Sequence, residues 1–336
     1  VMRVVALENE EINECWISDR DRFAYEGLNS TDRLTTPMVK QNGQWLETDW
    51  QSALDYVVHS MSDIQKQHGA NTLAALAHPI SSVEELYLLQ KVMRGLGSGQ
   101  VESRLHQIDT RGAAQLAWLG MPIAEINHLK RVLVIGSHLR KDQPLLAARI
   151  RTATKRGLQV YRLDAGGNDW LMPIGGQLIS APVGWVKHLT EIATAIAKAK
   201  SLTLPAGVQV ISVSAPAQRI ADQLLMGANS ENPEKQAIFL GALATAHPNA
   251  SDLHILAEFI AQSTGASLGF LGEGGNAVGA QVVGATQGNQ GSVESLLHSN
   301  ARAYVLMNLE PLMDLPNPQQ TRTALTKADT VIALSA

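Results

Sequence analysis

One stretch of the sequence constrains the fold more tightly than any other. Val132-Leu133-Val134-Ile135 is a continuous apolar run, which is typical of a strand buried on both faces. The turn Gly136-Ser137-His138 follows, and residues 144–155 then have the pattern of a helix that Gly157 stops. Residues 158–163 form a second apolar run. A strand, a helix and a strand in this order predict a βαβ unit and therefore a parallel sheet.

The same alternation continues through most of the chain. Residues 72–77 form a short apolar run, His78-Pro79 ends it, and a capping-box pattern at residues 81–85 opens a helix. Because single hydrophobic cores rarely grow past about 250 residues, a chain of 336 residues has room for two domains. The sequence therefore predicts an α/β protein. Further strand and helix units are expected at residues 208–226, at 237–265 and from 267 onward.

The beginning of the chain has a different pattern. Residues 1–36 carry charges in quick succession and are predicted to form an irregular, extended segment. The Asn-Gly pair at residues 42–43 lies between two short runs, which predicts a hairpin over residues 38–47. Thr48 and Gln51 have the spacing of a capping box, so we expect a helix to begin there.

Composition and charge exclude several classes of partner. The net charge is −4 with no block of like charge, which disfavours binding to nucleic acid or to an anionic membrane surface. No run approaches the ~18 consecutive apolar residues of a transmembrane helix, so we expect no insertion into a bilayer. Cys15 is the only cysteine, so this chain by itself can form no disulfide, no Cys-x-x-Cys metal site and no cysteine-held iron-sulfur cluster.

Loops at the carboxyl ends of strands are the candidate sites, because ligands of open α/β sheets collect there. Gly136-Ser137-His138 has backbone amides suited to a phosphate, although it matches neither a dinucleotide-binding motif nor a P-loop. Gly274-Gly275-Asn276 belongs to a glycine-rich stretch that permits close approach of a ligand. A tight turn at the first loop and a flexible structural loop at the second are the alternatives. The other loops of this kind are at residues 78–82, 164–168 and 241–247.

No further motif points to a particular chemistry. The ten histidines show neither His-x-x-x-His nor His-Glu-x-x-His spacing, which would indicate a metal site. The sequence also contains no Gly-x-Ser-x-Gly elbow of a serine hydrolase. The residues by themselves therefore support an α/β protein with a pocket at its strand ends, and they leave its function open.

Several blocks taken together resemble one family. The blocks are residues 13–28 (NECWISDRDRFAYEGL), 33–38 (RLTTPM), 84–91 (EELYLLQK) and 95–97 (GLG). They resemble the large iron-sulfur subunit, or G subunit, of bacterial respiratory NADH:quinone oxidoreductase (complex I), and the resemblance continues through residues 132–156 and 237–279. More widely, the chain is similar to the molybdopterin-dependent oxidoreductases related to formate dehydrogenase, whose fold the G subunit shares.

The resemblance implies an architecture. It implies α/β, Rossmann-like parallel-sheet domains of the formate dehydrogenase and DMSO reductase (molybdopterin oxidoreductase) type. Residues 329–334 form a last apolar run with no helix after it, so we expect the fold to be truncated within a longer protein. The expected parts are an N-terminal segment and hairpin at residues 1–49, a first α/β domain from residues 50–125 and 235–336, and a second α/β domain at residues 126–234.

The resemblance also implies where cofactors lie. The 2Fe-2S and 4Fe-4S clusters are expected in an N-terminal part that is missing here, and no cofactor is expected in this chain. Ser18 and Arg20 stand where molybdopterin relatives have a cluster cysteine and a lysine. The molybdenum ligand of the relatives corresponds to residues 101–109, where Ser103 and Asp109 are the candidates, although neither lies in a ligand motif. We therefore expect no metal ligand and no catalytic residue. The loops that correspond to the pterin-binding loops are expected to be vestigial, and their residues are Gly136, Ser137, His138, Gly274, Gly275 and Asn276.

Three functions are compatible with these observations. The leading hypothesis is a scaffold within the G subunit, which supports electron transfer from NADH to quinone and packs against other peripheral-arm subunits on the cytoplasmic side of the bacterial inner membrane. The first alternative is part of a catalytic molybdenum or tungsten bis-pterin oxidoreductase with Ser103 or Asp109 as metal ligand. The second is a regulatory module whose glycine-rich loops bind a nucleotide or another anion.

Overall fold

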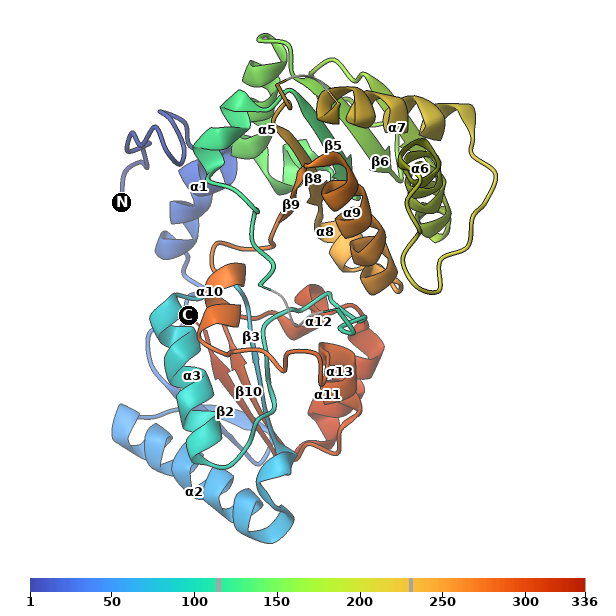
Figure 1. Ribbon diagram of the computed structural model, residues 1–336. Coiled ribbons are helices and arrows are strands. Elements are labelled where there is room, and N and C mark those ends of the chain that lie inside the picture. Colours follow the sequence, from blue (N-terminus) through green and yellow to red (C-terminus); the bar gives the residue numbers. More distant parts are fainter. Residues whose placement is uncertain (113–115, 230–231, 336) are drawn as a thin grey trace. The chain divides into compact units, whose positions relative to one another are not determined.

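The chain folds into two compact units, each with its own parallel sheet (Figure 1). The computed structural model describes residues 1–112, 116–229 and 232–335. Residues 113–115, 230–231 and 336, which the expected domain ranges include, lie outside the described residues. The first unit contains Val1, Ala24–Leu116 and Gly274–Ala336, and the second contains Met2–Phe23 and Ala117–Glu273.

The sheet of the second unit has five parallel strands in the order β7-β6-β5-β8-β9. The chain builds outward from β5 on one side and then returns to pair β8 against the other side of β5. The strand order therefore reverses between β5 and β8, which is the kind of switch point where open α/β sheets bind ligands. The strands are β5 (Arg131–Ile135), β6 (Gln159–Asp164), β7 (Gly176–Ile179), β8 (Gln236–Leu240) and β9 (Ser267–Phe270).

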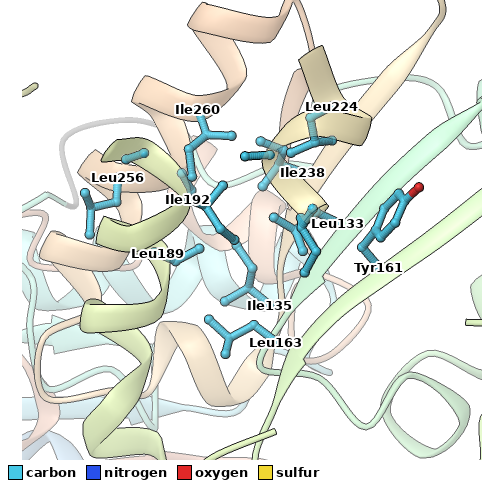
Figure 2. Packing of buried hydrophobic residues seen from close by; sticks show 14 of the residues in the cluster. Leu133, Ile135, Tyr161, Leu163, Leu189, Ile192, Leu224, Ile238, Leu256 and Ile260 are labelled. Atoms are coloured by element: carbon cyan, nitrogen blue, oxygen red, sulfur yellow. The ribbon is translucent and has the colours of Figure 1, made fainter. Parts of the chain in front are cut away.

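Alternate residues of β5 enter two different cores. Leu133 and Ile135 pack with the helices α6 (Trp185–Lys200), α7 (Ala215–Ala228) and α9 (Ala250–Thr264), and Figure 2 shows these side chains between strands and helices. Val132 and Val134 belong to the opposite core, with α5 (Pro144–Thr154) and the 3-10 helix η3 (Ile123–His128). Because strand side chains alternate between faces, burial of both faces requires the unbroken apolar run seen in the sequence. The predicted βαβ unit is confirmed.

The first unit repeats this arrangement with four parallel strands in the order β11-β10-β3-β4. Leu73, Ala75 and Ala77 of β3 contribute to one core, whereas Ala74 and Leu76 contribute to the other. One core contains residues of α2 (Trp50–His68), α3 (Val83–Gly95) and α10 (Ala277–Val282), and the other contains residues of α11 (Val293–His298) and α13 (Pro318–Lys327). The strands are β3 (Leu73–Ala77), β4 (Val101–Glu102), β10 (Ala303–Met307) and β11 (Thr330–Leu334).

The predicted hairpin is confirmed as β1 (Met38–Gln41) paired with β2 (Gln44–Glu47). Asn42 and Gly43 both have positive φ, at +50° and +81°, as a two-residue hairpin turn of this twist requires. The helix α2 that follows is capped differently from the prediction. Asp49, and not Thr48, is the N-cap, and its carboxylate accepts the backbone N–H of Ser52 at 2.9 Å.

Shorter elements connect these parts, and in the described ranges no helix combines the length and apolarity needed to cross a bilayer. The short helices and 3-10 turns are α1 (Asp19–Phe23), η1 (Ala24–Asn29), η2 (Ala70–Thr72), α4 (Leu139–Asp142), η4 (Pro182–Gly184), α8 (Ala242–Thr245) and α12 (Pro311–Asp314).

Two expectations about the segments before β8 and at the N-terminus were wrong. Residues 208–214 are described and contain no strand, because Val208 and Val213 pack against the helical core while the Ser214 backbone N–H donates to Glu191 of α6 at 3.3 Å. Residues 1–36 are not wholly irregular, since α1 forms at Asp19–Phe23 with the Ser18 side chain as its cap.

The expected return to the first domain at residue 235 was also wrong. β8 pairs with β5 over its full length, from Arg131 with Gln236 to Ile135 with Leu240. Ile238 and Leu240 lie in the same core as Leu133, so the pairing also completes a buried face of the second sheet. The chain therefore remains in the second unit through β9, and the first unit resumes at Gly274.

Truncation of Leu189 to alanine should lower the free energy of unfolding by about 2–5 kcal/mol, because this α6 side chain is fully buried against the sheet (Figure 2). Val183→Ala is the matched control, since Val183 is 88% exposed, and it should change the value by less than ~0.5 kcal/mol. Urea unfolding of both variants and the wild type measures the difference. Equal effects of the two substitutions would contradict this packing.

Candidate functional site

The first candidate loop, Gly136-Ser137-His138, leaves β5 at the switch point of the second sheet. Gly136 has a φ of +62°, in the left-handed region that favours glycine. A Cβ atom at Gly136 would lie 2.6 Å from Cζ3 of Trp185 and 2.7 Å from the backbone nitrogen of Ala244. The glycine is therefore required by packing of the loop against α6 and α8, which agrees with the tight-turn interpretation.

The hydrogen-bond donors of the first candidate loop are bonded to the carboxylate of Asp142. The His138 backbone N–H donates to Oδ2 of Asp142 at 2.8 Å, and the Ser137 hydroxyl donates to the same oxygen at 3.2 Å. Asp142 ends the short helix α4 that starts directly after His138. Because an anionic ligand would need the same donors, Asp142 both competes for them and repels a second negative charge. No pattern in the sequence marked Asp142 for this role.

The loop after β8 closes the switch point from its other side. A Cβ atom at Gly241 would collide with Cβ of Ser137 and lie 2.5 Å from the carbonyl oxygen of Gly136. The Leu243 backbone N–H donates to that carbonyl oxygen at 2.9 Å. The two loops that leave β5 and β8 are therefore in direct contact at the place where a ligand of such a sheet would enter.

The second candidate loop, Gly274-Gly275-Asn276, packs on the turn after β3. Gly274 has a φ of +76°, and a Cβ atom there would lie 2.9 Å from the carbonyl oxygen of Pro79. The Asn276 backbone N–H donates to the same oxygen at 2.9 Å, and its side-chain amide donates to the carbonyl oxygen of Ser81 at 2.8 Å. This loop belongs to the first unit and the Gly136 loop to the second, so each has its own local partners.

Asp164 is a buried carboxylate at the carboxyl end of β6, where only 2% of it is exposed. Its Oδ1 accepts the Ala165 backbone N–H at 2.7 Å, and its Oδ2 has no hydrogen-bond partner. Burial raises the pKa of Asp164 above its ordinary value, and this effect exceeds the opposing effects of the hydrogen bond from Ala165 and of the nearby Arg162 guanidinium. The sequence placed this residue in a candidate loop but gave no sign of its burial.

The residues that correspond to the molybdenum-ligand region form an internal ion pair. Glu102 is fully buried, and its carboxylate accepts the Ser103 backbone N–H at 3.0 Å and the Arg104 guanidinium at 2.6 Å. Arg104 also donates to the carbonyl oxygen of Gly288 at 2.8 Å. This pair therefore joins the end of β4 to the glycine-rich stretch. In the sequence, this ion pair was indicated only by an acidic and a basic residue two positions apart at the end of a short strand.

Ser18 and Arg20 have structural roles where the molybdopterin relatives have a cluster cysteine and a lysine. The Ser18 hydroxyl donates to Oδ2 of Asp21 at 2.6 Å and accepts the Asp21 backbone N–H at 3.1 Å. Arg20 donates to the carbonyl oxygen of Lys141 at 3.4 Å. Ser18 thus caps α1, and Arg20 attaches α1 to α4.

A polar cleft of about 320 Å³ lies elsewhere in the second unit. Gln159 and Gly176, which line it, are the first residues of β6 and β7, and α7 supplies Arg219 and Asp222. The cleft therefore opens at the amino ends of the strands, whereas the candidate loops lie at the carboxyl ends. None of the predicted site residues lines it.

Comparison with protein families identifies the chain. A family model described as "Molybdopterin oxidoreductase" matches residues 33–336, which is most of the sequence. The chain belongs to the molybdopterin oxidoreductase family. A second model, described as "NADH-ubiquinone oxidoreductase NDSU1/NuoG-like, 4Fe-4S domain", matches residues 1–26. The predicted fold class and the predicted resemblance are thereby confirmed.

Relatives and solved structures agree with this assignment. The G subunit of the NADH-quinone oxidoreductase of Rickettsia felis is 33% identical over 172 residues, which are 50% of this chain and 25% of the relative. The NADH-ubiquinone oxidoreductase 75 kDa subunit of Reclinomonas americana is 30% identical over 183 residues, which are 50% of this chain and 26% of the relative. The match thus spans about a quarter of each relative. Acetylene hydratase from Pelobacter acetylenicus superimposes with a TM-score of 0.70 at 14% identity, over 94% of this chain and 55% of that protein, which shows a shared fold.

The family name raises the question of a molybdenum-pterin cofactor, and the residues present do not fit one. Such a cofactor needs free backbone donors for its anionic groups and a protein ligand for its metal. The His138 amide is bonded to Asp142, Ser103 lies beside the buried Glu102 carboxylate, and the Asp109 carboxylate accepts from Arg111 at 2.9 Å. No group of three or more His, Cys, Asp or Glu side chains suited to a metal ion occurs among the described residues.

Gly136→Ala should destabilise the second unit by more than about 2 kcal/mol, because a Cβ atom there meets Trp185 and the Ala244 backbone at a positive φ. Gly167→Ala is the matched control in the same unit, since a Cβ at Gly167 has no heavy atom within 4 Å, and it should change stability by less than ~1 kcal/mol. Thermal unfolding followed by circular dichroism compares the variants. Equal melting temperatures would contradict the closed loop.

The stability of the Asp164→Asn variant should fall less with rising pH than the stability of the wild type. Because the folded pKa of Asp164 is raised above its unfolded value, its stabilising contribution is complete in acid and is lost as the pH rises through the folded pKa. The melting temperature of Asp164→Asn should therefore gain on that of the wild type as the pH rises above about 4, the ordinary pKa of an aspartic acid side chain.

Asp222→Asn, which changes an exposed carboxylate of the same unit, is the control for the pH series. A difference between Asp164→Asn and the wild type that stays constant with pH, or that moves in the opposite direction, would contradict the buried charge.

Proposed function

We propose that this chain is the molybdopterin-oxidoreductase-like body of a G-type subunit of a proton-pumping NADH:quinone oxidoreductase, and that it serves there as a scaffold without chemistry of its own. The order of the two family matches supports this, because the 4Fe-4S match at residues 1–26 directly precedes the molybdopterin oxidoreductase match at residues 33–336. The names of the relatives, from bacteria and from Reclinomonas americana, support it as well.

The observation that carries the scaffold role is the bond between Asp142 and the first candidate loop. In an open α/β sheet the loop at the switch point is the natural site for an anionic cofactor. Here the His138 amide donates to Asp142, and Gly136 and Gly241 bring their loops into contact. A site filled by the protein's own groups needs no ligand to keep its conformation, so it suits a part of the subunit that is retained for packing.

In this role, electrons pass from NADH to quinone through iron-sulfur clusters held in other parts of the same subunit and complex. A single cysteine, Cys15, supplies too few thiolates for a cluster, and it is exposed. The chain would contact other peripheral-arm subunits of complex I, at the cytoplasmic side of the bacterial inner membrane. It would contact neither nucleic acid nor the bilayer interior.

The two alternatives lack a supporting contact. A catalytic molybdenum or tungsten enzyme needs Ser103 or Asp109 as a metal ligand; the backbone of Ser103 is bonded to the buried, charged Glu102, and the Asp109 carboxylate accepts from Arg111. A nucleotide- or anion-binding module needs the amide of His138, which Asp142 already occupies. We therefore keep the scaffold as the proposed function.

Metal analysis tests the proposal. The 336-residue chain, treated with ferrous iron and sulfide under reducing conditions and also purified from cells supplied with molybdate and tungstate, should retain no stoichiometric iron, molybdenum or tungsten. A longer protein that includes a complete 4Fe-4S domain is the positive control and should retain iron and give paramagnetic cluster signals. Stoichiometric molybdenum together with pterin in either protein would overturn the scaffold role.

A further inference from the structure

A short turn near the N-terminus, residues 9–14, is bonded to a buried side chain of the second unit. Asn9 and Glu14 exchange two backbone hydrogen bonds of 2.8 Å, so residues 9–14 form a closed turn. The Asn13 side-chain amide donates to the carbonyl oxygens of Leu7 and Trp16, at 2.9 Å each. The turn therefore has a defined conformation of its own, although most of its residues are exposed.

A buried arginine of α5 holds this turn. Arg149 is only 3% exposed, and its Nη2 donates to the carbonyl oxygens of Glu10 at 3.0 Å and Ile12 at 3.4 Å. Its Nη1 lies 3.7 Å from a carboxylate oxygen of Glu14. Arginine is almost never buried unless it is paired, because its charge loses the hydration that it has in water.

A second contact lies a few residues further along the chain. Arg20 of α1 donates to the carbonyl oxygen of Lys141 at the end of α4, at 3.4 Å. The segment that includes the turn and α1 is therefore attached at two points, to α5 through Arg149 and to α4 through Arg20. Residues 2–23 belong to the second unit.

This segment is also the part of the chain that matches the 4Fe-4S domain model, at residues 1–26. Its apolar side chains are largely exposed, including Met2 at 93%, Leu7 at 88% and Trp16 at 58%. Exposed apolar side chains gathered on one segment indicate a surface that another folded part covers. The occupant that fits is the remainder of the 4Fe-4S domain, because these residues match that domain's own sequence.

We propose that Arg149 is a positioning residue that fixes the iron-sulfur domain of the longer protein on the α4–α5 side of the second unit. This inference rests on the proposed function for the identity of the docked domain, whereas the anchor itself is a property of the described residues. The guanidinium fork suits this task because one rigid group bonds two carbonyl oxygens and faces a carboxylate at once. A lysine offers a single point charge in its place.

Hydrogen exchange of the 336-residue chain tests the anchor directly. In Arg149→Met, amides of residues 9–16 should exchange about tenfold faster or more, because the turn loses its buried, charged hydrogen bonds. In Arg149→Lys, the exchange rates of these amides should lie between those of Arg149→Met and those of the wild type. Arg151→Met, an exposed position on the same helix, is the matched control and should leave these amides unchanged. Unchanged exchange at residues 9–16 in a folded Arg149→Met protein overturns the proposal.

A second variant covers the case in which Arg149→Met does not fold, as judged by exchange of the β5 and β6 amides. Asn13→Ala removes the two turn bonds without touching α5, so it should also speed exchange at residues 9–16 and leave β5 and β6 protected. Protection of residues 9–16 that persists in Asn13→Ala would count against a turn held as a unit by these bonds.

The longer protein separates this inference from the proposed function. In Arg149→Met, a complete 4Fe-4S domain should keep its iron but be released by limited proteolysis several-fold faster than in the Arg151→Met control. Equal release with clusters present rejects the docking role of Arg149. A longer wild-type protein that binds no iron rejects the proposed function instead, and leaves the exchange result on the anchor standing.

Discussion

Burial of both faces of a parallel sheet is the constraint on which the rest of this structure depends. In β5, Leu133 and Ile135 enter one core while Val132 and Val134 enter the other. Helices must therefore cover both sides, and β3 imposes the same requirement on the other unit. Crossovers between parallel strands are right-handed as a rule, and the connections β5-α5-β6 and β8-α9-β9 run in opposite directions across the sheet, so α5 and α9 lie on opposite faces. With this reversal of strand order, helices cover both faces of the sheet.

A reversal of strand order is where open α/β sheets bind ligands, and in this chain the loops at the reversal contact one another and bond to a carboxylate of the protein. Gly136 and Gly241 allow the loops after β5 and β8 to come into contact. The Asp142 carboxylate accepts hydrogen bonds from the Ser137 hydroxyl and the His138 backbone N–H. A fold shared with acetylene hydratase therefore carries no implication of a shared site. At this switch point, two glycines and one carboxylate bring the loops together and bond their donors.

Buried charges in this protein join segments that are far apart in sequence. Glu102 and Arg104 connect the end of β4 to the glycine-rich stretch, and Arg149 connects α5 to the N-terminal turn. In each case a charged side chain loses hydration and regains hydrogen bonds to backbone carbonyls or a carboxylate. Such contacts orient loops and terminal segments that the hydrophobic cores leave unspecified, which is the property a scaffold needs.

Local sequence determined the elements whose signal lies within a few residues. The apolar run of β5, the Asn42-Gly43 turn and the capping box of Ser82 and Glu85 each depend on neighbours along the chain, and each was predicted correctly. Only the tertiary structure decided that β8 pairs with β5, that residues 208–214 pack without forming a strand, and that Asp142 closes the Gly136 loop. Those outcomes depend on which surfaces far apart in the sequence pack together. Hydrophobic periodicity indicates that a face is buried, but it does not indicate the element against which that face packs.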